Sequence, residues 1–137
     1  MNILFLLTPQ SQVASIYSDC TLRQGLEKMK AHGYTALPVL TRDNQYVGTV
    51  SEGDFLWNML DRRDNSIRSK EKLMVSDILR SGFNPSVNIY VTMEELMTRA
   101  VSQSFIPVVD DRGFFIGIVT RQKIIQHFID RQSHGQD

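Results

Sequence analysis

The chain has 137 residues, 42% of them hydrophobic, and this length is enough to bury a core without disulfides or metals. Its 15 basic and 15 acidic residues balance, so no overall charge attracts nucleic acid or a membrane surface. The single cysteine, Cys20, has no partner for an internal disulfide, and no apolar run approaches the roughly 20 residues that span a bilayer. The apolar opening 1–7 lacks the basic start and the cleavage site of a signal peptide, so we expect a cytoplasmic protein.

The first half of the chain predicts a helix, two strands and a second helix. The first helix begins after Thr21, a typical N-cap, and its apolar residues recur at helical spacing. Two apolar runs, 37–40 and 46–50, flank a polar turn and predict a β-hairpin. An apolar stripe between residues 55 and 60 predicts the second helix.

The same order of elements returns in the second half. A helix is expected after Thr92, a hairpin from the runs 106–109 and 114–119, and a last helix from the apolar stripe 124–129. A unit of two strands is marginal alone, so two such units should pack their apolar faces together. The sequence therefore predicts an α+β fold made of two helix-strand-strand-helix repeats.

The charged segment 62–72 separates the two halves and is the expected linker. The first repeat is then expected to occupy residues 1–61 and the second residues 73–131. Residues 132–137 have little to bury, so we expect them to form a flexible tail.

Each half contains a similar phrase where its second strand leads into its last helix. The first copy, residues 48–54, reads Gly-Thr-Val-Ser-Glu-Gly-Asp, and the second, residues 117–123, reads Gly-Ile-Val-Thr-Arg-Gln-Lys. An apolar segment with a central proline precedes each copy, at residues 36–40 and 105–109. These ordered copies resemble a tandem pair of CBS domains, a family named after cystathionine beta-synthase, from about Leu6 to Ile129.

The resemblance implies two repeats related by pseudo-twofold symmetry, with an adenine nucleotide such as AMP, ADP or ATP bound in the cleft between them. It also implies a homodimer and a regulatory role without catalysis, in which the ligand changes conformation or the binding of an effector protein. The segment 33–39, together with Thr120 and Arg121, resembles free-standing CBS pairs that bind cyclic di-AMP. Two alternatives therefore stay open, a cyclic di-AMP receptor and a dimerisation or scaffold module without ligand.

Three residues of the first copy suit an adenine nucleotide. The carboxylate of Asp54 can accept hydrogen bonds from both ribose hydroxyls. The Ser51 hydroxyl and the first amides of the helix can bind a phosphate, and Gly48 allows close approach of the backbone. Ser51 and Asp54 also fit a helix capping box, in which the two side chains satisfy terminal amides. The two roles are compatible.

The second copy departs from this pattern because Lys123 stands in the place of Asp54. A lysine cannot accept hydrogen bonds from ribose hydroxyls. Thr120 can still bind a phosphate, and Arg121 and Lys123 add positive charge beside it. The second copy is therefore predicted to be directed to phosphate, unless both cations are merely solvated residues in the first turn of a helix.

The resemblance places the adenine base against one short segment of each repeat. Tyr34 and Phe105 are the candidates for stacking on the base, whereas Leu37 and Ile106 are more simply residues of the core. The complete sets implied by the resemblance are Tyr34, Thr35, Ala36, Leu37 and Pro38 in the first repeat, and Ser104, Phe105, Ile106 and Pro107 in the second.

Other functional classes find little support in the sequence. No nucleophile and base, magnesium-binding carboxylates or phosphate loop can be recognised, so no catalytic residues and no catalytic cofactor are expected. His32, His127 and His134 lack the spacing of a metal site, and no basic stripe indicates nucleic-acid binding. Trp57 lies beside an apolar stripe and is a candidate dimer contact.

Overall fold

The computed structural model describes residues 3–61 and 73–135 and divides the chain into two compact units. The first-repeat unit is Ala14–Phe83, and the second-repeat unit combines Met1–Val13 with Asn84–Asp137. The expected linker, residues 62–72, lies outside the described residues.

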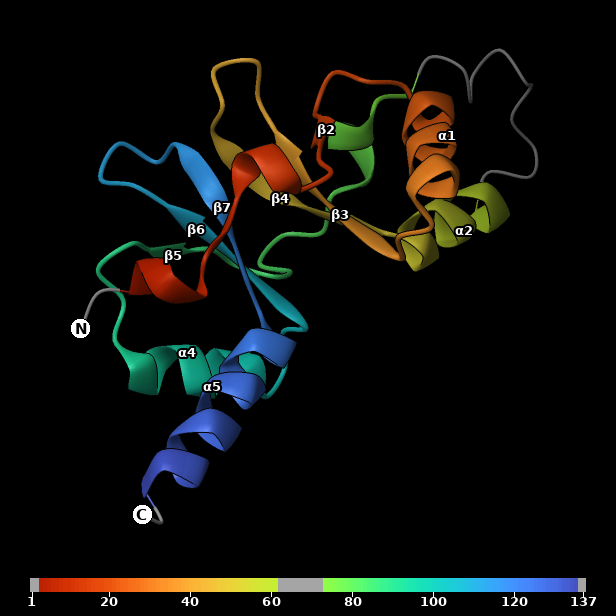
Figure 1. Cartoon of the computed structure of the whole chain (residues 1–137). Coiled ribbons are helices and arrows are strands. Elements are labelled where there is room, and N and C mark those ends of the chain that lie inside the picture. The colour runs from red at the N-terminus through yellow and green to blue at the C-terminus, as the bar shows by residue number, and fades with distance from the viewer. Residues whose placement is uncertain (1–2, 62–72, 136–137) are drawn as a thin grey trace. The chain divides into compact units, whose positions relative to one another are not determined.

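The first-repeat unit contains a three-stranded sheet in the order β2-β3-β4 (Figure 1). Strand β2 runs parallel to β3, and β3 and β4 form the expected antiparallel hairpin. The elements in chain order are β2 (Ile16–Tyr17), α1 (Leu22–His32), β3 (Ala36–Leu40), β4 (Tyr46–Ser51), α2 (Glu52–Asp61) and the 3-10 helix η3 (Val75–Ile78).

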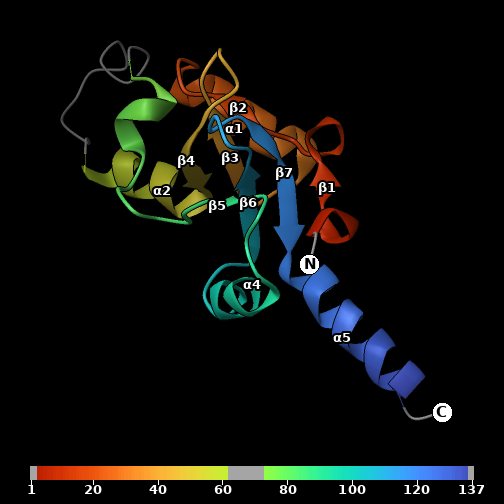
Figure 2. The same ribbon diagram turned by 90° about the vertical axis from the view of Figure 1, so that its left-hand side faces the viewer.

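The second-repeat unit contains a four-stranded sheet in the order β1-β7-β6-β5, and β7 leads directly into α5 (Figure 2). Strands β6 and β7 form the second hairpin, and β1 joins β7 antiparallel at the edge. The elements are η1 (Ile3–Leu6), β1 (Thr8–Pro9), η2 (Gln10–Gln12), β5 (Val87–Asn88), α4 (Met93–Ala100), β6 (Phe105–Val109), β7 (Phe115–Thr120) and α5 (Arg121–Gly135).

The predicted α+β class and the helix-strand-strand-helix order are confirmed in both units. Thr21 caps α1 by accepting from the Gln24 amide, and Thr92 caps α4 by accepting from the Glu95 amide. Helix α1 ends at Gly33, whose φ of 67° is the left-handed conformation that glycine adopts readily. Helix α5 continues through Gly135, so residues 132–135 of the expected tail are helical.

The strand register repeats together with the sequence. Ser51 lies opposite Ala36 in the first hairpin, and Thr120 lies opposite Phe105 in the second. Both hairpins also shift register after the same equivalent position, between residues 39 and 40 and between residues 108 and 109. The two strand-turn-helix phrases therefore have the same local setting.

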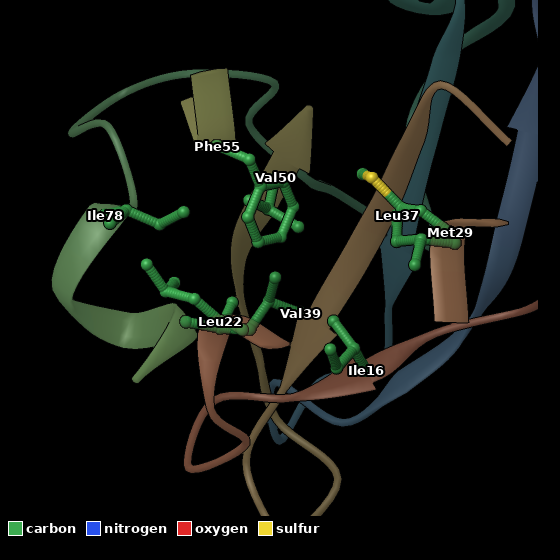
Figure 3. Close-up of a cluster of buried hydrophobic side chains, with 9 residues drawn as sticks. Ile16, Leu22, Met29, Leu37, Val39, Val50, Phe55 and Ile78 are labelled. Carbon is green, nitrogen blue, oxygen red and sulfur yellow. The ribbon is translucent and has the colours of Figure 1, made fainter. Parts of the chain in front are cut away.

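Each unit has its own apolar core. In the first-repeat unit, Phe55 of α2 packs with Val50 of β4 and with residues from α1, β2, β3 and η3 (Figure 3). In the second-repeat unit, buried residues from α4, α5 and the sheet pack with Ile3 and Leu6 of η1. Burial of such side chains is the main favourable term in folding.

The compact units do not follow the sequence repeats at their first segments. Ile3 and Leu6 begin the first repeat but are buried in the core of the second-repeat unit. Val75 and Ile78 begin the second repeat but are buried in the core of the first-repeat unit. Within the residues described, no helix is both long enough and apolar enough to cross a bilayer.

Candidate functional site

Ser51 and Asp54 meet where β4 passes into α2. The Asp54 carboxylate accepts from the Ser51 amide at 2.8 Å and from the Ser51 hydroxyl at 3.0 Å, both through Oδ2. The Asp54 amide in turn donates to the Ser51 hydroxyl at 3.4 Å. The capping interpretation is therefore confirmed, and the carboxylate is held at the helix N-terminus, where negative charge is stabilised.

Arg80 completes this cluster and was missed by the sequence analysis. Its Nε lies 2.6 Å from Asp54 Oδ1, and one terminal nitrogen lies 3.4 Å from both Asp54 Oδ2 and the Ser51 hydroxyl. The guanidinium also stacks on Phe83, 3.6 Å from the ring centroid. Arg80 follows η3, far from the motif in sequence, and no residue pattern pointed to it.

The glycine of each motif lies against the first segment of the other repeat. A Cβ at Gly48 would lie 3.2 Å from the Leu79 side chain. A Cβ at Gly117 would collide with the backbone oxygen of Thr8 in β1. The close neighbour is therefore a side chain at Gly48 and backbone at Gly117, and both neighbours are the chain's own residues.

In the second copy, Thr120 caps α5 by accepting from the Lys123 amide at 3.2 Å. The Lys123 ammonium donates to the Thr8 hydroxyl at 2.8 Å, and Arg121 Nε donates to the Ala100 carbonyl at 2.7 Å, beside the end of α4. Arg121 thus has a structural role as a C-terminal cap for α4, whereas Lys123 is exposed.

The residues expected at the base divide between surface and core. Tyr34 is half exposed and stacks on His32, with ring centroids 5.8 Å apart. The carbonyls of Thr35 and Ser104 accept from the first amides of α2 and α5, at 3.0 and 2.9 Å. Ala36 and Phe105 are partly exposed. The buried members of the two sets are Leu37, Pro38, Ile106 and Pro107.

A groove of about 470 Å³ lies between α1 and α2 in the first-repeat unit. Tyr34 and Thr35 contribute to it, but Ser51 and Asp54 do not. The structure thus puts the expected base and ribose-phosphate residues of the first copy in two neighbouring places. The groove is lined by Leu26, Met29, Lys30, Gly33, Tyr34, Thr35, Glu52, Phe55, Leu56 and Met59.

No three histidine, cysteine or carboxylate side chains gather into a metal site within residues 3–61 and 73–135. Cys20 carries a free thiol and packs against the core of its unit, as its small apolar character favours. His127 lies between the rings of Phe5 and Phe128, with centroids 5.0 and 5.7 Å away.

The repeated α+β units, each with a hydroxyl cap at the strand-to-helix junction, define a duplicated two-domain module. The model of the CBS domain family matches residues 6–61 and again residues 73–130. The chain therefore belongs to the CBS domain family and carries a tandem pair of these domains. CBS domains are generally regulatory and non-catalytic.

Part of a protein named as an enzyme is similar in sequence to this chain. The chain is 30% identical over 112 residues to a homoserine O-acetyltransferase of Methanohalophilus mahii, covering 82% of this chain but 22% of that protein. A second relative, an uncharacterised protein of Methanopyrus kandleri, is 27% identical, and the match spans 49% of its length. The chain thus spans about a fifth to a half of these relatives.

Solved structures resemble the chain over nearly its whole length. A CbpB protein in complex with c-di-AMP has a TM-score of 0.89 at 21% identity, covering 100% of this chain and 90% of that one. CbpB of Listeria monocytogenes in complex with c-di-AMP has a TM-score of 0.80 at 26% identity, covering 93% and 94%. CBSX2 in complex with AMP has a TM-score of 0.76 at 22% identity, covering 96% and 98%.

Proposed function

We propose that this chain is a non-catalytic regulatory module that binds an adenine nucleotide through Ser51 and Asp54 of its first repeat. The observation that carries the proposal is the cluster of a hydroxyl, a carboxylate and the Arg80 guanidinium at the N-terminus of α2. Ligand binding then changes the conformation of the chain or its affinity for an effector protein. This requires that the ligand binds one conformation of the chain more tightly than another.

Each group in the cluster matches one part of a nucleotide. The Asp54 carboxylate accepts hydrogen bonds from ribose hydroxyls, and bonds to a charged acceptor are among the stronger ones in proteins. The Ser51 hydroxyl and the first amides of α2 suit a phosphate oxygen. Arg80 offers a planar set of donors that phosphate accepts in pairs.

The second repeat is proposed to bind phosphate without clamping a ribose. Thr120 and Lys123 lie together at the start of α5, and the exposed ammonium of Lys123 bonds only a neutral hydroxyl in the contact described above. The cation gains a stronger partner when an anion arrives. Arg121 is the weaker candidate because its Nε already serves the Ala100 carbonyl.

The base-binding residues follow the family resemblance. Tyr34 and Phe105 supply rings for stacking, and the backbone of the neighbouring residues supplies edge hydrogen bonds. A carbonyl that accepts one amide retains a second lone pair, so the carbonyls of Thr35 and Ser104 can still take part. Gly48, Ala36, Pro38, Ile106 and Pro107 shape the backbone around them.

Cyclic di-AMP is the alternative ligand, supported by the 26% identity to the Listeria monocytogenes protein solved with it. Its riboses are esterified at the 3′ oxygen, so each keeps one free hydroxyl, whereas AMP has two. Asp54 therefore contributes more to binding of AMP than to binding of cyclic di-AMP. A cytoplasmic location fits either ligand and the single free thiol of Cys20.

A dimerisation module without ligand is the second candidate function. Helix α2 exposes large apolar side chains, with Leu56 at 56%, Trp57 at 66% and Met59 at 50% of their surface. The groove between α1 and α2 carries one cation, Lys30, and one anion, Glu52, a combination that suits an isologous contact with a second copy. A homodimer is compatible with nucleotide binding as well.

The experiment is calorimetric titration of the chain with AMP, ADP, ATP and cyclic di-AMP, with GMP as the control for base selectivity. We expect at least one adenine ligand to bind with micromolar affinity, and ATP with magnesium to show no sustained turnover. A folded protein that binds none of the four adenine ligands would leave the dimerisation module as the better account, and steady ATP hydrolysis would contradict both.

A further inference from the structure

The carboxylate proposed to receive ribose is already occupied. The side chain of Asp54 is only 6% exposed, and Arg80 Nε lies 2.6 Å from Oδ1 while Ser51 fills Oδ2 with two hydrogen bonds. Arg80 contacts both oxygens, Oδ1 through Nε and Oδ2 through a terminal nitrogen at 3.4 Å, so it covers acceptor positions that ribose hydroxyls need. A ribose can take them only when Arg80 moves.

The Arg80 guanidinium can change its anionic partner while it stays stacked on Phe83. Its side chain is 52% exposed, and its terminal nitrogen lies 3.4 Å from its acceptors, which is a weak hydrogen-bond distance. The short contact between Nε and Asp54 Oδ1 is therefore the main interaction that a ligand has to replace. The guanidinium face rests on the Phe83 ring, and this contact depends little on which anion the edge of the group meets. The arginine can therefore exchange one anion for another while it stays on the ring.

We propose that Arg80 is a specificity-determining residue that makes the site select phosphorylated adenine ligands over the bare nucleoside, by exchanging the Asp54 carboxylate for the ligand's phosphate. This inference rests on the proposed function. A neutral nucleoside has to break the Arg80–Asp54 pair and gives the arginine no new partner. A nucleotide supplies a phosphate for Arg80 and frees the carboxylate for its own ribose in the same step.

The second repeat lacks the parts for this exchange. Lys123 stands in the place of Asp54, and its ammonium bonds the neutral hydroxyl of Thr8 rather than a carboxylate. Among the residues that the structure describes, Lys123 forms no ion pair that a phosphate would displace, and so no acceptor is released for ribose. Coupled recognition of phosphate and ribose is therefore a property of the first-repeat unit.

The test is calorimetric titration of the wild-type chain and Arg80→Gln with AMP, cyclic di-AMP and adenosine. In the wild type we expect AMP to bind at least about a hundredfold more tightly than adenosine, because only AMP gives Arg80 a charged partner in exchange for Asp54. In Arg80→Gln we expect the affinity for adenosine to rise and that for AMP to fall, so the ratio shrinks by about tenfold or more.

A matched control is Arg42→Gln in the same unit. Arg42 also pairs with a carboxylate, Asp19 at 2.9 Å, and stacks on a ring, Tyr17 at 4.0 Å. Its hydrogen bonds hold the pKa of the Asp19 carboxyl below its usual range. Both pairs join a guanidinium to a carboxylate and stack the guanidinium on a ring. We expect Arg42→Gln to keep the wild-type ratio of AMP to adenosine affinity.

The wild-type chain provides a second test that needs no variant. Inorganic phosphate should occupy Arg80, free Asp54 and thereby tighten adenosine binding, and Arg80→Gln should lose this effect. An unchanged ratio in Arg80→Gln, together with no effect of phosphate on the wild type, overturns the role of Arg80 while leaving the proposed function intact. If no adenine ligand binds the wild type, the proposed function is contradicted, and the role of Arg80 is contradicted with it.

Discussion

The hydroxyl of Ser51 caps α2 and at the same time faces the place proposed for phosphate, whereas the hydroxyl of Thr92 caps α4 where no ligand is proposed. Substitution of Ser51 and of Thr92 therefore distinguishes the effect of capping on stability from the effect of the hydroxyl on ligand binding. We expect Ser51→Ala and Thr92→Ala each to lower the free energy of unfolding by about 1 kcal/mol. Only Ser51→Ala should also weaken AMP binding, which denaturation and calorimetry measure together. An equal loss of AMP affinity in both variants would mean that the Ser51 hydroxyl acts only as a helix cap.

Residues that repeat at fixed spacing were predictable, and residues brought in by packing were not. Ser51 and Asp54 were predicted to lie together because three positions separate them at a helix start, and their bonds confirm that local geometry. Arg80 was not, because its contact with Asp54 depends on where η3 packs and spans 26 residues. The stack of Tyr34 on His32 is a local contact between residues two positions apart, and no residue pattern indicated it.

Helices and hairpins carry a periodic signal, and the shortest strands do not. The four helices with bounds given above and both hairpins follow apolar periods that were visible in the sequence. Strands β1, β2 and β5 contain two residues each, too few to show alternation, and their pairing is a tertiary event. The partner that crowds Gly117 was therefore invisible until β1 was placed beside β7.

This crowding gives a prediction for the edge of the second sheet. Gly117→Ala would force β1 away from β7, because the obstacle is a backbone oxygen that cannot rotate aside. At the equivalent Gly48, the obstacle is the flexible side chain of Leu79. We expect Gly117→Ala to lower the free energy of unfolding by about 2–3 kcal/mol and Gly48→Ala by less, as measured by chemical denaturation. The reverse order would contradict the pairing of β1.

At the scale of the whole molecule, the sequence repeat and the compact unit are different divisions of the chain. The apolar 3-10 segments η1 and η3 each pack into the core of the unit that holds the other repeat's hairpin. A linear pattern cannot reveal this exchange, because each segment offers two apolar side chains for burial and the sequence does not show which core receives them. One consequence is that neither sequence half, cut at the linker, contains its complete core.

The homodimer is also tested at this scale. Trp57→Ser removes the most exposed large side chain of α2, and we expect it to shift the chain from dimer to monomer in light scattering at micromolar concentration. Tyr90→Ser is the matched control, because Tyr90 is 77% exposed but lies outside α1 and α2. A dimer that persists in Trp57→Ser and dissociates in Tyr90→Ser would place the contact elsewhere.

The most direct measurement of the central claim is a calorimetric cycle that combines wild type and Asp54→Asn with AMP and 2′-deoxy-AMP. If Asp54 receives the ribose, loss of the 2′ hydroxyl weakens binding to the wild type by about tenfold and hardly affects Asp54→Asn, since the interaction is then already gone. Equal weakening in both proteins, so that the two changes simply add, would show that the hydroxyl and this carboxylate never meet.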